Sequence, residues 1–563
     1  MALPDLDSLW VLCKASLGFL LALAIAEVIS FITTGWRYRA LVSKLQRAGK
    51  PMPDHSPILG HLLAAKVASE ELPRGAHSSY ITDRLAKKLG ADAYYFDTYP
   101  INAVLLIVND PYIANQALNH PRTNAEKPPG LADWFAPISG RGGMNLFTQN
   151  GQLWKHDHDI FLPFFNNGNL DAAMPFVIKE MLVLRDVLRR KTKAGELFRL
   201  EPLTLMLMND ITGRIVFNAE LGNQTSGPHP LSKTMLRQLS LKFVVSNVMD
   251  NLGQLNPLRS FETWNNGRLL DKHIKTQIQK RLDVYRNAKT QDDQSRFNSI
   301  LDQAFEVYYS QPGRQRSDAL DDEFLTMLCA QLRMFFFAGY DSTSATMIAS
   351  VYLIWKHPDV LARLRTEHDQ VFGPHVPACP DMIAENPSIL NSLTYTNAVI
   401  KETLRLFPPA NGIRMGSKDL ILKGRDNTEY PTENVAIQMN HLSIMRNPKA
   451  WVRPLEFVPD RFLVSPDHEL YPPKGAWRPF EFGVRNCTGQ AFVMKELRAF
   501  LAIFAREFDF KECYDEVYAD EDVDLTNVDN EKAFLITAGA AHPRGEFPCR
   551  ISLSKYASDG VHA

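Results

Sequence analysis

Cys487 is the residue of this chain whose surroundings most clearly indicate chemistry. It lies in a glycine-flanked loop that reads Phe480-Glu481-Phe482-Gly483-Val484-Arg485-Asn486-Cys487-Thr488-Gly489. Glycines let the backbone pass close to a flat or bulky group. A nearby arginine and the start of a predicted helix both favour a thiolate, the form in which cysteine binds a soft metal ion. A lone cysteine of this kind is more often structural, so the assignment depends on the rest of the chain.

The other five cysteines give no sign of a metal site or a disulfide framework. No pair is spaced as Cys-x-x-Cys, and they are sparse for a chain of 563 residues: Cys13, Cys329, Cys379, Cys513 and Cys549. Cysteines with this distribution are usually small buried side chains in a reducing compartment.

A second candidate for chemistry is an acid beside hydroxyls, in the segment Ala338-Gly339-Tyr340-Asp341-Ser342-Thr343. Apolar residues recur at helical spacing from Leu325 to Trp355, which predicts a buried helix through this segment. Glycine costs about 1 kcal/mol inside a helix, and Ser or Thr can bond back to the preceding turn and bend it. A bent helix with an acid and an alcohol at the bend can hold water for proton delivery. The competing interpretation is a buried helix with a polar patch.

Glu402 and Arg405 form a third candidate group, because their spacing puts them on one face of a predicted helix. An exposed pair of this kind contributes about 0.2–0.5 kcal/mol. The neighbouring residues are apolar, which indicates a partly buried face. A buried arginine can then reach a further partner through its planar fork.

The elements that must position these residues are predicted to be mainly helices. From about Phe147 the pattern is mostly helical, and a shorter helix opens at Asp110-Pro111. Short strands are predicted at Tyr94–Phe96, Val104–Val108, Leu420–Leu422 and Val435–Ile437. No internal repeat divides the chain, so one large unit fits better than two in spite of the length.

Composition excludes some classes of function. Hydrophobic residues make up 45% and charged residues 22% of the chain, a balance typical of globular proteins rather than disordered ones. The formal net charge is -1 and basic residues form no long block, so nucleic-acid binding is not expected.

The N-terminal segment is predicted to anchor the chain in a membrane. It is apolar from Leu9 to Thr34 except for Lys14 and Glu27, which is long enough to cross a bilayer core of about 30 Å. Acidic residues precede this stretch and basic residues follow it, which favours a retained anchor over a cleaved signal peptide and places the main domain in the cytosol. We therefore divide the chain into an anchor (1–35), a basic and proline-rich linker (36–62) and a main domain (63–563).

The order Phe-x-x-Gly-x-Arg-x-Cys-x-Gly around Cys487 resembles the haem-binding loop of the cytochrome P-450 family at every specified position. Three further segments resemble motifs of that family and follow in the same order: Ala338–Thr343, Glu402–Arg405 and Pro459–Phe462. The resemblance implies a cytochrome P-450 fold, mainly α with a small β region and preceded by one N-terminal transmembrane helix. It also implies haem b, with Cys487 as the axial thiolate that binds the iron.

The resemblance assigns roles to further residues. Phe480, Arg485 and Gly489 would bind the haem beside Cys487, and the propionates would also be held by Trp154, His158 and Arg414. His158 stands where the family commonly has arginine. Glu402, Arg405 and Arg461 would form a buried structural network.

Proton delivery would fall to Asp341, Ser342 and Thr343. Ser342 stands where the family usually has threonine, so it keeps the hydroxyl and loses the β-branch that stiffens the side chain. Which of the two hydroxyls serves the relay is left open.

The function implied is that of a monooxygenase that inserts one oxygen atom from O2 into a lipophilic small molecule, by hydroxylation, epoxidation or desaturation. Electrons would come from NADPH through NADPH–cytochrome P-450 reductase, with cytochrome b5 as a further partner. Lys155, Lys495 and Arg498 would contact the reductase. The protein would be a single-pass protein of the endoplasmic reticulum membrane with a cytosolic catalytic domain. The sequence of Trp477–Phe480 resembles that of fungal family members that act in secondary metabolism.

Two other functions stay open: a reductase-independent haem-thiolate isomerase or dehydratase, and a haem-binding protein without catalysis. The acid–alcohol pair Asp341-Ser342 favours the monooxygenase, because the isomerases often lack it. The substrate is not specified. Residues from Pro128 to Asn145 and from Phe534 to Gly539 would line its pocket, and their aromatic and aliphatic side chains indicate an apolar ligand.

Overall fold

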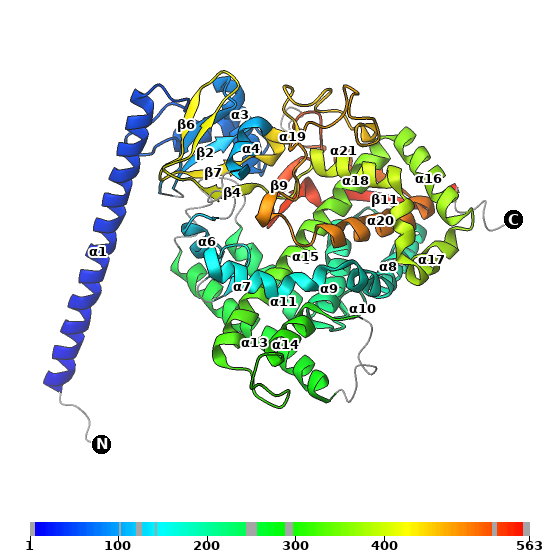
Figure 1. Cartoon of the computed structure of the whole chain (residues 1–563), viewed down its shortest axis with the longest axis horizontal. Helices are drawn as coiled ribbons and strands as arrows, with labels where there is room; N and C mark the ends of the chain where they lie inside the picture. Colours follow the sequence, from blue (N-terminus) through cyan, green and yellow to red (C-terminus); the bar gives the residue numbers. More distant parts are fainter. Residues whose placement is uncertain are drawn as a thin grey trace.

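A computed structural model of the chain describes residues 6–100, 103–119, 126–140, 143–243, 256–287, 297–520 and 526–555. It shows a mainly helical body with small sheets, as expected (Figure 1). The helices are α1 (Leu6–Arg47), α2 (Leu62–Glu70), α3 (Ser78–Leu89), α4 (Pro111–Asn119), α6 (Gly130–Ser139), α7 (Gly151–Phe161), α8 (Asn167–Ala194), α9 (Glu201–Phe217), α10 (Asn223–Ser226), α11 (Pro230–Lys242), α13 (Pro257–Asn287), α14 (Ile300–Tyr309), α15 (Asp322–Lys356), α16 (Pro358–Phe372), α17 (Cys379–Glu385), α18 (Thr394–Leu406), α19 (His441–Met445), α20 (Gln490–Glu507) and α21 (Tyr514–Val517).

The strands of the described residues are short and form four small sheets. They are β1 (Ala93–Asp97), β2 (Val104–Val108), β3 (Phe198–Arg199), β4 (Gly412–Met415), β5 (Ile421–Lys423), β6 (Glu429–Pro431), β7 (Ala436–Met439), β8 (Phe508–Glu512), β9 (Leu535–Thr537), β10 (Ala541–Pro543) and β11 (Pro548–Leu553). The predicted strands thus correspond to β1, β2, β5 and β7.

The largest sheet has the order β1-β2-β7-β4, in which β2 and β7 are parallel and the other pairs are antiparallel. Every residue of β1 and β2 is buried, because helices or loops cover both faces. This explains why β2 reads as a continuous apolar run rather than as an alternating one. Arg414 lies on β4, at one edge of this sheet.

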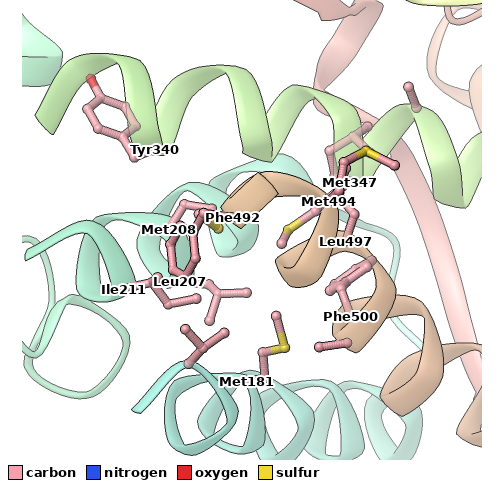
Figure 2. Packing of buried hydrophobic residues seen from close by; sticks show 14 of the residues in the cluster. Met181, Leu207, Met208, Ile211, Tyr340, Met347, Phe492, Met494, Leu497 and Phe500 are labelled. Atoms are coloured by element: carbon pink, nitrogen blue, oxygen red, sulfur yellow. The ribbon is translucent and has the colours of Figure 1, made fainter. Parts of the chain in front are cut away.

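Helix α15 runs through the centre of the helical body, and α9 packs along it (Figure 1). Asp321 caps the first turn of α15 by accepting a hydrogen bond of 2.7 Å from the N–H of Phe324. Figure 2 shows the packing around it: Met181 of α8, Leu207, Met208 and Ile211 of α9, Met347 of α15, and Phe492, Leu497 and Phe500 of α20. The helix predicted from Leu325 to Trp355 is confirmed.

Gly339 has a packing role within α15. A Cβ at this position would lie 3.0 Å from Cγ2 and 3.2 Å from Oγ1 of Thr212 on α9. Glycine therefore lets the two helices approach closely at the segment that carries Asp341.

Helix α1 continues well beyond the predicted anchor, as far as Arg47, so the first part of the predicted linker is helical. Its C-terminal end is fixed to the body: Arg39 forms an ion pair with Asp97 and donates 2.7 Å to the carbonyl of Ile58. Within the described residues, none of the helices combines the length and apolar character that crossing a bilayer requires. Residues 1–5 and many side chains before Ile25 lie outside the described part of the chain.

Candidate functional site

Cys487 lies in a turn between the 3₁₀ segment Gly483–Arg485 and the start of α20. Its N–H donates a hydrogen bond of 2.9 Å to the carbonyl of Phe480, which closes the loop. Gly483 has a φ of 76°, in the left-handed region that favours glycine. Cys487 itself is exposed. The loop thus presents one thiol on a backbone held in a tight turn.

The expectation that Arg485 lowers the pKa of this thiol is wrong. Although Cys487 is exposed to solvent, desolvation by the protein packed around its sulfur raises the pKa of the thiol, and the N–H groups of Gly489 and Gln490 offset this only in part. Arg485 points away, since it donates 2.9 Å to the carbonyl of Gln149. A metal ion bound by Cys487 would favour the thiolate, because metal coordination deprotonates a thiol.

Arg485 joins two other predicted residues. Its guanidinium lies 4.6 Å from the centre of the Trp154 ring, and that ring lies 4.8 Å from the ring of His158. Trp154 and His158 occupy the same face of α7. Three of the residues predicted to bind the propionates are thus brought together from α7 and the Cys487 loop.

Two more cations lie beside Arg485. Burial and the charge of Arg414 lower the pKa of Arg485 to about 9. Lys127 is also buried, and burial together with the charges of Arg414 and Arg485 holds its pKa well below the usual range. Its Nζ donates 3.2 Å to the carbonyl of Ile413, the neighbour of Arg414. Lys127 belongs to no sequence motif, so the sequence alone does not indicate that it lies at this site.

The carboxylate of Glu481 partly compensates the positive charge of this cluster. Glu481 forms an ion pair of 3.1 Å with Arg414 and lies 3.2 Å from Nε2 of His441. Although burial opposes ionisation, His441, Arg414 and Arg478 lower the pKa of Glu481 to about 2. Gly412 leaves room for it, because a Cβ there would lie 2.7 Å from the Glu481 carboxylate.

The cluster fits the haem that the Cys487 loop implies. In the described part of the chain, Nε of Arg414 and one terminal nitrogen of Arg485 are buried without a hydrogen-bond partner. Unpaired buried donors of this kind are costly, and carboxylates satisfy them. Lys127, Arg414 and Arg485 against Glu481 leave an excess of positive charge, which suits a group with two propionates.

The acid and the two hydroxyls of α15 have different surroundings. Ser342 is half-buried, and its hydroxyl donates 2.9 Å to the carbonyl of Ala338, an exposed residue one turn earlier. Thr343 is fully buried, and its hydroxyl has no hydrogen-bond partner among the described residues. Asp341 faces a strand hairpin and accepts 2.5 Å from the N–H of Ala540. Ser342 is thus the hydroxyl on the accessible side of the helix.

Glu402, Arg405 and Arg461 form one network whose side chains are completely buried. Arg405 donates 2.7 and 2.8 Å to the two oxygens of Glu402, and Arg461 donates 3.0 Å to one of them. Arg405 also donates to the carbonyls of Met445 and Pro454. The network therefore ties α18 to the segments that lead toward the Cys487 loop.

The three residues expected to meet a redox partner differ in accessibility. Lys155 is exposed and forms an ion pair with Asp159 on the same helix. Lys495 is buried and forms an ion pair with Asp171, so the expectation that it contributes a surface charge is wrong. Arg498 is partly buried and donates 2.8 Å to the carbonyl of Leu390.

The aromatic residues predicted to line a substrate pocket form a contiguous group. The ring of Phe135 lies 4.7 Å from that of Trp134 and 5.0 Å from that of Phe147. Leu535, on the other predicted segment, is buried in β9.

Comparison with known proteins gives consistent matches along nearly the whole chain. The model of the family described as cytochrome P450 matches residues 51–532. Cytochrome P450 monooxygenase polC of Polytolypa hystricis is 33% identical over 561 residues, covering 98% of each chain. Cytochrome P450 monooxygenase acrF of Aspergillus aculeatus is 28% identical over 82% of this chain and 94% of its own length. Human cytochrome P450 3A5 is 23% identical over 88% of this chain and 91% of its own length.

Proposed function

This chain belongs to the cytochrome P450 family and is a monooxygenase with a haem-thiolate cofactor, and we propose that it oxidises a lipophilic small molecule in a tailoring step of fungal secondary metabolism. The observation that carries the proposal is that one loop contains Cys487 and Arg485 and holds Arg414 through the ion pair with Glu481. A thiolate-bound haem supplies the activation of O2 and the transfer of one oxygen atom.

Individual residues support this chemistry. Cys487 would bind the iron, and Phe480 and Gly489 would shape the loop on either side of it. Arg414, Arg485 and Lys127 would hold the propionates, with Trp154 in contact with Arg485 and His158 beside Trp154. In the same proposal, Glu402, Arg405 and Arg461 keep the loop in place.

Ser342 is the proposed donor of protons to the oxygen side of the haem. Its hydroxyl lies on the accessible side of α15, whereas Thr343 is buried. Asp341 would pass protons to Ser342, and Thr343 would have a packing role. A positioned hydroxyl accelerates a reaction by proton transfer only when it reaches the accepting atom or a bridging water.

The lipophilic substrate is supported by the aromatic group Trp134, Phe135 and Phe147 and by fungal relatives whose names include monooxygenase. Hydroxylation, epoxidation and desaturation are all compatible with such a site. Electrons would come from NADPH through NADPH–cytochrome P-450 reductase, with cytochrome b5 as a further donor.

An anchor at residues 1–35 in the endoplasmic reticulum membrane, with residues 63–563 in the cytosol, belongs to the same proposal. It rests on the apolar stretch from Leu9 to Thr34, on the basic residues that follow it and on the similarity to human cytochrome P450 3A5. Protease treatment of sealed microsomes tests this topology. The main domain should be digested without detergent, and its protection would contradict the proposed orientation.

The central experiment is the spectrum of the reduced, carbon-monoxide-bound full-length protein. We expect the Soret band of a thiolate ligand in the wild type, and its loss in Cys487→Ala. A band at the position of an imidazole ligand would contradict the assignment of Cys487. NADPH consumption that depends on added reductase and rises with a lipophilic substrate would separate a monooxygenase from a reductase-independent isomerase.

A further inference from the structure

A histidine lies between two carboxylates in the interior of the protein, directly beside the site. His542 of β10 forms an ion pair through Nδ1 with Glu201, in the first turn of α9. Its Nε2 lies 3.3 Å from Oδ1 of Asp341 on α15. All three residues are buried. Three elements far apart in the sequence therefore contribute one charge each to a single group.

The hairpin that carries His542 holds Asp341 at a second point. The N–H of Ala540 donates 2.5 Å to Oδ2 of the carboxylate. Gly539 has a φ of 121°, and a Cβ there would lie 2.6 Å from the same oxygen. The close approach of the hairpin to Asp341 therefore requires glycine. Each carboxylate oxygen of Asp341 is bound by a different residue of the hairpin.

The charges around His542 favour its protonated form. Burial alone would lower the pKa of His542, but the carboxylates of Glu201 and Asp341 raise it to about 10. Tyr514 of α21 faces Glu201, and its own hydroxyl donates 2.7 Å to the carbonyl of Arg544. Tyr340 precedes Asp341 on α15 and is also buried. The array thus contains one cation between two anions.

We propose that His542, fixed by Glu201, is a positioning residue for Asp341 and controls the supply of protons from this acid to Ser342. This inference rests on the proposed function of the chain. His542 turns the Asp341 carboxylate toward the hairpin, while the next residue, Ser342, lies on the accessible side of the helix. The charge of the imidazolium and the N–H of Ala540 hold the Asp341 carboxylate in place, ready to take up a proton and pass it toward Ser342.

The proton balance of this step is simple. His542 keeps both ring protons throughout, because its pKa of about 10 makes the imidazolium a far weaker acid than a carboxylic acid. Asp341 takes up one proton from water and passes that proton toward Ser342. Glu201 and His542 keep their charges, so the three groups end with the total charge with which they began.

The first test measures coupling in the full-length holoenzyme reconstituted with reductase. In His542→Gln, we expect the fraction of NADPH electrons released as hydrogen peroxide to rise at least threefold, with haem content and substrate KM unchanged. His368→Gln is the matched control, because His368 is completely buried and burial lowers its pKa to about 3, so it is neutral. Equal coupling in wild type and His542→Gln would overturn the proposal.

The second test does not depend on activity. A pKa raised from 6.5 to about 10 contributes stability that is complete below pH 6.5 and is lost as the pH rises through 10. The thermal midpoint of the wild type should therefore fall over this range relative to His542→Gln, while His368→Gln follows the wild type. Parallel pH profiles of wild type and His542→Gln would show that His542 carries no charge and would also overturn the proposal.

The two tests separate this inference from the proposed function. If the wild type consumes no NADPH with reductase, the monooxygenase assignment fails, yet the pH profile still decides whether His542 is charged. If coupling is normal in the wild type and both tests fail in His542→Gln, only the role of His542 is rejected.

Discussion

The hydroxyl of Ser342 donates a hydrogen bond of 2.9 Å to the carbonyl of Ala338, whereas the adjacent hydroxyl of Thr343 is buried and has no partner among the residues that the structure describes. Two neighbouring alcohols on one helix thus point into different surroundings. The bond occupies a backbone carbonyl of the preceding turn, as serine often does inside helices. It keeps the Ser342 hydroxyl beside the exposed surface of Ala338.

Replacing the two hydroxyls separately distinguishes their roles. Ser342→Ala should raise peroxide release relative to product severalfold, because the proposed proton donor is removed. Thr343→Val keeps the shape of the side chain and removes an unpaired buried hydroxyl, so it should change stability by less than about 1 kcal/mol and leave coupling unchanged. NADPH, peroxide and product are measured together. Normal coupling in Ser342→Ala would remove this residue from the mechanism.

Lys127 should contribute to haem retention. In Lys127→Met, the haem should dissociate about tenfold faster, since a hydrogen bond to a charged group contributes about 1.5–3 kcal/mol. Transfer of haem to excess apomyoglobin measures the rate. Lys155→Met is the control, because Lys155 is exposed and paired within its own helix, and its rate should match the wild type. An unchanged rate in Lys127→Met would place this lysine outside the propionate site.

Glu402 should be far more important for stability than a surface carboxylate. Glu402→Gln leaves two buried guanidinium groups without a counter-charge, and breaking a buried pair in this way costs about 3–5 kcal/mol. Glu262→Gln removes an exposed partner of Arg237 and should cost less than about 1 kcal/mol. Urea unfolding measures both, together with the haem content after expression. Similar losses in the two variants would argue against a structural network.

Gly339 should show an energetic coupling to Thr212. Gly339→Ala gains helix propensity of about 1 kcal/mol but places a methyl group 3.0 Å from Thr212 Cγ2, and overpacking costs about 1–3 kcal/mol. We expect a net loss of stability that Thr212→Ala reverses in the double variant. A double-mutant cycle by urea unfolding measures the coupling. If the two substitutions change the free energy of unfolding additively, α9 accommodates the added methyl group without an energetic cost.

Much of this protein is encoded in local sequence patterns. Helical spacing from Leu325 to Trp355 predicts α15, the apolar run Val104–Val108 predicts β2, and the loop around Cys487 marks the haem ligand. These features depend on periodicity and on residues close together in the chain, so one sequence is enough to identify them.

Only the tertiary structure determines which distant charges meet. Lys127 and His542 belong to no motif, yet each lies in a buried group with residues from other elements. The structure also turns Arg485 away from Cys487 and pairs Lys495 with Asp171. The orientation and pKa of a buried charge are set by desolvation and by partners that only the folded chain brings close. The sequence therefore determined the family and marked Cys487 as the candidate ligand of its haem, and the fold decided which buried charges lie together at the proposed proton and propionate sites.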